Sequence, residues 1–285
     1  MRFALWGCGS IGQRHLRNIV ELGYRDVTVY DTSREKRTSV SAAHGVRSVE
    51  TAEELLESGA DIAIVATPTI YHQDQLFELL ERTGSNVFVE KPVSHTLKGL
   101  AELLQLSRRR ACKVMVGCNW RFYPAVRRIR ELLDEGVIGP PLSARVEGGS
   151  YLPDWHPSED YRTGYSARKD LGGGCLLDCI HEIDYSNWLF GRPVDVVGFH
   201  GSLGGLEIDT EDVASLLVRY EAGTLVTLNV DYVQRPAHRS CRIVGRDGTI
   251  DATLDSVGIG TSRDVLQAFL KDRFGVDRGR GGSVT

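Results

Sequence analysis

The sequence predicts an α/β protein with two domains: an N-terminal doubly wound parallel sheet, then a C-terminal α+β domain with an open, mostly antiparallel sheet. Short apolar runs alternate with amphipathic helical segments as far as residue 120, and a glycine-rich turn follows the first run. Beyond residue 121 the pattern changes to alternating strands joined by short turns. We expect domains at 1–120 and 121–275 and a mobile tail at 276–285.

The N-terminal half carries apolar runs of the length of buried strands. They lie at residues 3–6, 27–30, 62–66, 87–89 and 114–116. Between them, residues 74–81 and 97–108 place apolar side chains three and four apart, as a helix with one buried face does. Strands that are apolar on both faces and alternate with helices indicate a parallel sheet covered on both sides.

The glycine-rich turn at residues 7–12 reads Gly-Cys-Gly-Ser-Ile-Gly and matches G-x-G-x-x-G. After a strand and before a helix, this pattern binds the pyrophosphate of a dinucleotide. The first glycine permits the turn, the second lets the backbone approach the phosphates, and the third lets helix and strand pack closely.

An acidic residue at the end of the second apolar run indicates whether NAD or NADP is bound. Asp31 is placed to accept hydrogen bonds from the adenosine ribose and to repel a 2′-phosphate. The expected cofactor is therefore NAD, and Arg34 nearby leaves NADP as the less favoured alternative. Cofactor contacts are expected from Gly7, Gly9, Ser10, Ile11, Gly12, Asp31 and Arg34.

Two further segments follow strands at the edge where open α/β sheets bind ligands. One is residues 66–72, and the other is 90–92 (Glu-Lys-Pro). A lone lysine after a strand is usually solvated, but the preceding acid and the φ-fixing proline favour a held, functional Lys91. Further cofactor contacts are expected from Thr67, Pro68, Thr69, His72, Glu90 and Lys91.

The C-terminal half alternates polar and apolar residues. Residues 224–232 read as a strand with one buried face, joined by a short turn to another strand at 213–220. Residues 239–244 and 249–252 predict further strands, and residues 174–190 predict a helix that packs on the sheet.

That helix places Asp178, His181 and Asp184 at successive three-residue spacings, so the three can share a face. A carboxylate beside an imidazole orients the ring and raises its basicity, as a general base requires. A helix-terminal acid next to a structural core histidine is the alternative interpretation.

Residues 151–169, just before the helix, are rich in aromatic and cationic side chains. Aromatic faces cover the C–H faces of a sugar, and an arginine such as Arg168 can fork a carboxylate or phosphate. The segment therefore suits an anionic sugar, with an ordinary exposed loop as the alternative. Substrate contacts are expected from Trp155, His156, Arg162, Gln234 and Arg235.

Together these motifs resemble the Gfo/Idh/MocA family of oxidoreductases, named for glucose–fructose oxidoreductase and inositol dehydrogenase. The matching segments are residues 7–12, 66–69, 90–92, 119–122 (Asn-Trp-Arg-Phe) and 172–188. The resemblance implies a Rossmann domain, an open-faced sheet often used for oligomer contacts, and action on sugars, polyols or nucleotide sugars. It also implies that Lys91 holds or polarises the reacting oxygen and that His181 exchanges its proton. We further expect Asp178 to be catalytic, and Arg121 and Asp178 to contact the substrate.

Two features depart from the family pattern. Members commonly space the aspartate and histidine four apart, whereas Asp178 and His181 are three apart, which leaves the role of the aspartate open. Members usually continue beyond the equivalent of residues 268–270 with a helix and a closing strand, where this chain has a Gly/Arg tail. A trimmed second domain or an incomplete chain is therefore expected.

Composition excludes several function classes. The 34 Lys and Arg against 38 Asp and Glu argue against broad nucleic-acid binding. No apolar window approaches the ~18 residues of a membrane helix. The six cysteines lack a metal-binding spacing and fit a cytoplasmic protein. We expect no metal, no nucleic acid and no membrane partner, but a homo-oligomer joined through the C-terminal sheet.

The favoured hypothesis is an NAD-dependent dehydrogenase or reductase acting on a CH–OH group of a sugar-like substrate. One alternative is a dehydrogenase of a non-sugar diol. Another is a dinucleotide-binding sensor or scaffold without turnover. The joint presence of Lys91 and His181 favours an enzyme, because a pure binding module needs neither.

Overall fold

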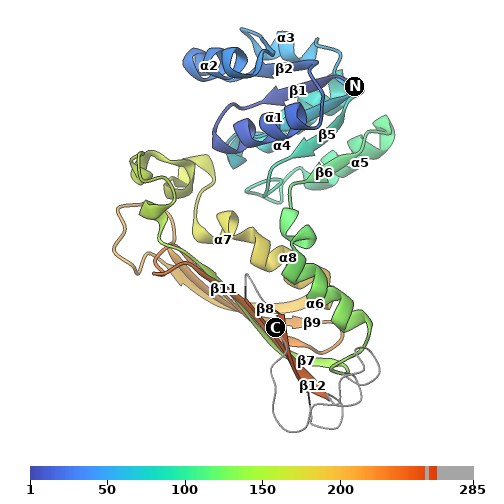
Figure 1. Cartoon of the computed structure of the whole chain (residues 1–285), viewed down its shortest axis with the longest axis vertical. Coiled ribbons are helices and arrows are strands. Elements are labelled where there is room, and N and C mark those ends of the chain that lie inside the picture. Colours follow the sequence, from blue (N-terminus) through green and yellow to red (C-terminus); the bar gives the residue numbers. More distant parts are fainter. Residues whose placement is uncertain (254–256, 262–285) are drawn as a thin grey trace. The chain divides into compact units, whose positions relative to one another are not determined.

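The computed structural model describes residues 1–253 and 257–261, so the tail predicted at 276–285 lies outside the described residues. The chain forms two compact units (Figure 1). The first comprises residues 1–117 with 170–172, and the second comprises 118–169 and the described residues from 173 on.

The first unit is a six-stranded parallel sheet in the order β3-β2-β1-β4-β5-β6. Its strands are β1 (Phe3–Trp6), β2 (Val27–Tyr30), β3 (Arg47–Ser48), β4 (Ile62–Val65), β5 (Asn86–Val89) and β6 (Val114–Val116). Its helices are α1 (Ser10–Glu21), α2 (Arg34–His44), α3 (Ala52–Leu56), α4 (Thr69–Arg82) and α5 (Leu100–Arg110). The strand order runs outward in both directions from β1, which confirms the predicted doubly wound fold.

Both faces of β1 are buried, as its uninterrupted apolar sequence requires. Leu5 packs in one apolar cluster with Leu16 of α1, and Trp6 packs in another with Leu76 of α4. Burying each such leucine stabilises the fold by about 1.5–3 kcal/mol. The sheet therefore holds the carboxyl ends of β1 and β4 rigidly, at the switch point where open α/β sheets bind ligands.

The second unit is a seven-stranded sheet in the order β13-β12-β11-β7-β10-β9-β8. Among the described strands of this sheet only the β7–β10 pair is parallel, so the predicted open, mostly antiparallel sheet is confirmed. Its strands are β7 (Pro141–Gly149), β8 (Pro193–Gly201), β9 (Val213–Tyr220), β10 (Leu225–Asp231), β11 (His238–Gly245), β12 (Gly248–Thr253) and β13 (Val257–Thr261). Its helices are η1 (Asn119–Phe122), α6 (Pro124–Asp134), α7 (Cys175–Asp178) and α8 (Ile180–Phe190), with single turns η2 (Leu152–Asp154), η3 (Tyr161–Thr163) and η4 (Tyr165–Ala167); η5 (Lys169–Leu171) spans the boundary between the units.

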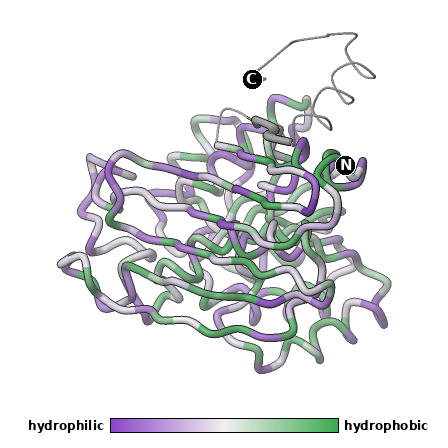
Figure 2. The backbone as a smooth tube through the Cα atoms, turned by 90° about the horizontal axis from the view of Figure 1, so that it is seen from below, coloured by the Kyte–Doolittle hydropathy of each residue, from purple (hydrophilic) through white to green (hydrophobic). Residues whose placement is uncertain are grey.

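One face of this sheet is covered and the other is open. Helices α6 and α8 share an apolar cluster with alternate residues of the strands, such as Val226 and Leu228. The opposite face mixes polar and apolar side chains, among them Thr227, Asn229 and Leu217. Figure 2 shows the strands running side by side, with hydrophilic and hydrophobic positions interspersed along them. On that face Phe199 is 83% exposed and Leu217 is 43% exposed.

The helix predicted over residues 174–190 is broken. Cys179 has φ −86° and ψ 31°, outside the helical range, and separates α7 from α8. Asp178 therefore ends one helix while His181 and Asp184 lie on the next. The prediction that all three residues share one continuous helical face is wrong. Among the described residues no helix combines the length and apolarity needed to cross a bilayer.

Candidate active site

The three glycines of the glycine-rich turn lie in different surroundings. Gly7 has φ 106°, which disfavours a side chain, and a Cβ there would overlap the Ala66 carbonyl. A Cβ on Gly12 would overlap the Gly7 carbonyl oxygen. Gly9 alone of the three faces open space, since a methyl group on its Cα would have no neighbouring atom within 4 Å.

Gly9 is also the N-cap of α1, and no side chain caps this helix within the described residues. The N–H groups of the first turn, which includes Ser10 and Ile11, thus point from a helix N-terminus beside an open backbone surface. A helix N-terminus of this kind binds phosphate. The turn therefore fits the pyrophosphate of a dinucleotide.

Asp31 follows β2 and faces the same turn. One carboxylate oxygen accepts the backbone N–H of Cys8 at 2.8 Å, and the other accepts that of Ser33 at 2.8 Å. These bonds fix the carboxylate and leave some of its roughly four lone-pair positions for ribose hydroxyls. Arg34, at the exposed start of α2, is the nearest cation in sequence.

His72 connects the two segments that follow β4 and β5. Its Nδ1 lies 2.8 Å from the Pro92 carbonyl oxygen and its Nε2 lies 2.8 Å from the Thr67 carbonyl oxygen. The ring is 1% exposed, and burial lowers the pKa of His72. His72 is therefore suited to hold residues 67–69 and 90–92 in place, so any cofactor role is indirect.

Glu90, which precedes Lys91, forms a contact that the sequence did not suggest. Its Oε1 lies 2.7 Å from Nε2 of His15 on α1, and its Oε2 accepts the backbone N–H of Lys91 at 3.2 Å. Burial raises the pKa of Glu90, but the hydrogen bond and charge of His15 outweigh it, so the net pKa is lowered. An anionic Glu90 thus links α1, the helix of the glycine turn, to the Glu-Lys-Pro segment.

His181 stands in the first turn of α8 and is 9% exposed. Its ring centroid lies 6.0 Å from that of Trp120 in η1. Three residues further along α8, the Asp184 carboxylate accepts hydrogen bonds from Nε (2.8 Å) and Nη2 (2.6 Å) of Arg121. Arg121, expected at the substrate, therefore anchors η1 to α8 on the helix that carries His181.

Asp178 is surrounded by hydroxyl groups. Tyr165 donates to one carboxylate oxygen, while Ser166 at 2.6 Å and Tyr232 at 3.2 Å donate to the other. Burial, followed by the nearby Asp178 charge, raises the pKa of both tyrosines, so their protons are retained. Three hydroxyl groups thus hold the Asp178 carboxylate in place, and its catalytic role remains a prediction.

The remaining predicted substrate contacts, in the aromatic and cationic segment and after β10, differ in exposure and in hydrogen-bond partners. Trp155 donates to Ser150 at 2.6 Å and packs edge-on against Tyr232, whereas His156 is exposed. At the end of β10, the Arg235 guanidinium lies 3.2 Å from the Tyr151 ring centroid. Beside it, the backbone N–H of Gln234 donates to Asp231 at 2.7 Å.

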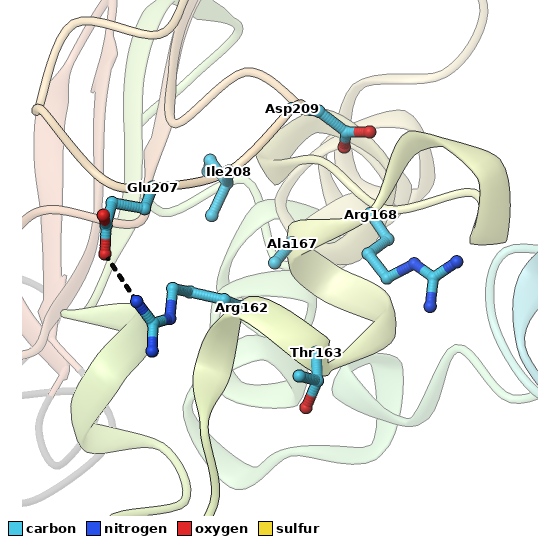
Figure 3. A pocket seen from close by; sticks show the side chains of 7 residues that line it. All are labelled: Arg162, Thr163, Ala167, Arg168, Glu207, Ile208 and Asp209. Atoms are coloured by element: carbon cyan, nitrogen blue, oxygen red, sulfur yellow. Dashed lines mark hydrogen bonds and ion pairs between the residues drawn. The ribbon is translucent and has the colours of Figure 1, made fainter.

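A cavity of about 520 Å³ lies in the second unit (Figure 3). Arg162 on its wall points toward Glu207, which accepts from it at 2.9 Å, and Asp160 accepts two further bonds at 2.8 Å. Two carboxylates thus bind the one guanidinium, and the substrate contact expected of Arg162 remains a prediction. Arg168 points away from that pair. The cavity is lined by Arg162, Thr163, Ala167, Arg168, Glu207, Ile208 and Asp209.

Metal-binding chemistry has no support in the part of the chain that the structure describes. Residues 1–253 and 257–261 contain no cluster of three or more His, Cys, Asp or Glu side chains able to hold an ion. All six cysteines fall within residues 1–253 and none of them forms a disulfide there, and burial raises the pKa of Cys175 and Cys179.

Comparison with known proteins gives two matches to one family. Residues 1–118 match the oxidoreductase family, NAD-binding Rossmann fold, and residues 126–251 match the GFO/IDH/MocA C-terminal domain. These stretches contain the motifs at residues 7–12, 66–69, 90–92 and 172–188, and the motif at 119–122 falls between them. The resemblance drawn from these motifs is confirmed.

Individual relatives agree with this assignment. The 1,5-anhydro-D-fructose reductase of Ensifer adhaerens is 26% identical over 255 residues, covering 87% of this chain and 74% of the relative. The inositol 2-dehydrogenase of Rhizobium meliloti (strain 1021) is 31% identical over 203 residues, covering 69% of this chain and 57% of the relative. The WlbA dehydrogenase from Bordetella pertussis, solved with NADH and UDP-GlcNAcA, shares the fold at a TM-score of 0.83 and 23% identity over 92% of this chain and 78% of that chain. The chain belongs to the Gfo/Idh/MocA family of oxidoreductases, and its first unit is an NAD-binding Rossmann domain.

Proposed function

We propose that the protein transfers a hydride between NAD and a secondary alcohol or ketone of a sugar, sugar acid or nucleotide sugar. The observation that carries this proposal is the pairing of a Rossmann unit carrying Lys91 with a second unit that carries a nearly buried His181. The names of the relatives, a sugar reductase and an inositol dehydrogenase, support a polyhydroxylated substrate. When bound, NAD supplies the hydride acceptor.

The residues of the chain would divide the remaining work. The first domain, predicted at 1–120, would hold the dinucleotide through the N–H groups after Gly9 and through Asp31. The second, predicted at 121–275, would hold the substrate. Lys91 would bind the reacting oxygen, and the His181 imidazole would take the hydroxyl proton, because its ordinary pKa is near neutral pH.

A substrate panel tests the proposal. The full chain is incubated with NAD and a series of sugars, sugar acids, nucleotide sugars and simple diols, and NADH absorbance is followed. We expect NADH formation with at least one sugar-type substrate. Turnover confined to simple diols would support the non-sugar alternative. Tight NAD binding without any turnover would support the sensor or scaffold.

We also propose that the substrate is anionic, supported by Arg168 on the wall of the cavity. Arg168→Ala is expected to raise KM for a sugar acid at least about tenfold more than for its neutral analogue, since a hydrogen bond to a charged group contributes ~1.5–3 kcal/mol. Arg162→Ala should act in the same direction but less strongly, because Asp160 and Glu207 already bind its guanidinium. Arg192→Ala is the matched control, an exposed arginine of the same unit. Equal changes in KM for both substrates in Arg168→Ala would contradict the proposal.

The open sheet face supports a proposal of homo-oligomerisation. A hollow of about 450 Å³ on this face is lined in part by Val197, Phe199 and Leu217. Covering one such side chain is worth about 1.5–3 kcal/mol, so Phe199→Asp is expected to lower the sedimentation coefficient to that of a smaller species. Leu97→Asp is the control, since Leu97 is 88% exposed in the first unit. An unchanged sedimentation coefficient for Phe199→Asp would exclude this face.

A cytoplasmic location is proposed from the chemistry of the cysteines. None of the six forms a disulfide within residues 1–253, and five of them are buried. Disulfides persist in oxidising compartments and are rare in the cytosol. Cell fractionation that finds the protein in an exported fraction would contradict this proposal.

A further inference from the structure

We propose that Arg239 is a positioning residue for His181, acting from β11 through Glu182 and through the ring of Trp120. No sequence motif points to Arg239. The inference rests on the proposed function, because it assigns a task to the setting of the proton-exchanging histidine.

The first contact joins Arg239 to the residue that follows His181. Nε of Arg239 lies 2.9 Å from Oε1 of Glu182, whose side chain is 0% exposed. A carboxylate so deeply buried requires a counter-charge, and breaking such a pair is strongly unfavourable. The first turn of α8 is therefore tied to strand β11 at the position next to His181.

The sheet is shaped to admit this contact. Arg239 stands directly opposite Gly148 of β7 in the strand register. A Cβ on Gly148 would overlap the Glu182 carboxylate, so glycine at this position leaves the space that Glu182 occupies. Helix α8 and strands β7 and β11 thus meet at one buried ion pair.

The second contact joins Arg239 to the ring beside His181. The guanidinium carbon lies 4.3 Å from the centroid of Trp120, and Trp120 stacks on Tyr123 at 4.7 Å. The same Trp120 ring lies 6.0 Å from the His181 ring at an interplanar angle of 43°. A planar guanidinium stacks on an indole face, which a lysine ammonium cannot do in the same way.

Arg239 therefore contacts two neighbours of His181: Glu182, the next residue in the chain, and Trp120, whose ring lies beside it. Because Glu182 offsets its charge, the effect on His181 is mainly geometric. A base held in one orientation loses less freedom on reaching the transition state, and a small misplacement of a reacting group can cost about 100-fold in rate.

The test compares Arg239→Lys with Arg242→Met, both on β11. Lysine keeps a charge for Glu182 but loses the planar stack. Arg242 is an exposed control, 3.8 Å from Asp251. For Arg239→Lys we expect kcat to fall by about 10- to 100-fold, with KM and the NAD Kd within about twofold. Arg242→Met should leave all three unchanged. Wild-type kcat in Arg239→Lys would overturn the proposal, as would an equal loss in Arg242→Met.

A second measurement separates positioning from stability. Arg239→Met removes the ion-pair partner of Glu182 and is expected to lower Tm. The double variant Arg239→Met/Glu182→Gln should have a recovered Tm, but its kcat should stay low. Recovery of both would mean that the pair is only structural, and would overturn the proposal.

A third readout does not depend on turnover. The ¹⁵N resonances of His181, assigned by their loss in His181→Asn, are expected to shift or broaden in Arg239→Lys and to stay unchanged in Arg242→Met. Unchanged His181 resonances in Arg239→Lys would overturn the positioning role even if the proposed function holds. If the resonances shift but the protein turns over no substrate, the positioning role stands and the proposed function is contradicted.

Discussion

Replacing His181 by alanine is expected to lower kcat by about 10²–10⁴-fold, the usual contribution of a positioned acid or base. Oxidation of an alcohol requires the hydroxyl proton to leave as the hydride departs, and a neutral imidazole is matched to that transfer near pH 7. The NAD affinity should stay unchanged, because every residue proposed to hold NAD lies in the first unit whereas His181 lies in the second.

Steady-state kinetics on a confirmed substrate and calorimetric titration with NAD measure the two quantities. His200→Ala is the control, an exposed histidine of the same unit that belongs to no predicted site. Lys91→Ala should lower kcat in the same direction. Asp178→Asn and Asp184→Asn should be compared, since only the carboxylate that orients the imidazole should shift the pH profile of kcat. Wild-type turnover by His181→Ala would show that another base, such as Lys91, removes the hydroxyl proton.

Substituting alanine for Gly9 is expected to weaken NAD binding at least about tenfold, which is ~1.4 kcal/mol, without lowering Tm. Gly9 has φ −70° and ψ −174°, an extended conformation that any residue adopts. A methyl group there meets no protein atom within 4 Å, so the free protein should tolerate it. The methyl would instead occupy the space through which a phosphate approaches the N–H groups of α1.

Gly12→Ala provides the contrast in the same turn. Its methyl would overlap the Gly7 carbonyl, so Tm should fall together with NAD affinity. Thermal unfolding and NAD titration of both variants distinguish the two roles. NAD binding at wild-type strength by Gly9→Ala would mean that the pyrophosphate does not approach this surface.

Much of the fold was predictable because its signals are local. The apolar runs of the first unit became β1, β2, β4, β5 and β6, since a strand buried on both faces has no polar position to interrupt it. The break at Cys179 was missed because a single residue leaving the helical range inside an apolar run carries no local signal. The bonds of Asp178 were missed as well, since Tyr232 is 54 residues away.

The site was predictable where a motif encodes it and not where tertiary structure assembles it. The glycine turn and the Glu-Lys-Pro segment appear where expected, at the ends of β1 and β5. His15 was missed because its partner Glu90 lies 75 residues away. For Arg162 a local signal existed, because Asp160, two residues earlier, is the nearest acid to claim its guanidinium.

The pairing of β7 has a consequence for the order in which the chain can fold during synthesis. In the first unit each strand finds a neighbour close in sequence. Among the described strands, however, β7, which ends at residue 149, pairs only with β10 from residue 225 and β11 from residue 238. At ~5–20 residues per second, β7 emerges from the ribosome roughly 4–15 s before its first neighbour is made. During that interval its apolar alternate residues, Ala144 and Val146, have no sheet to enter. Chaperone occupancy of nascent chains should therefore concentrate between these two strands, while the Rossmann unit has already been synthesised up to residue 117.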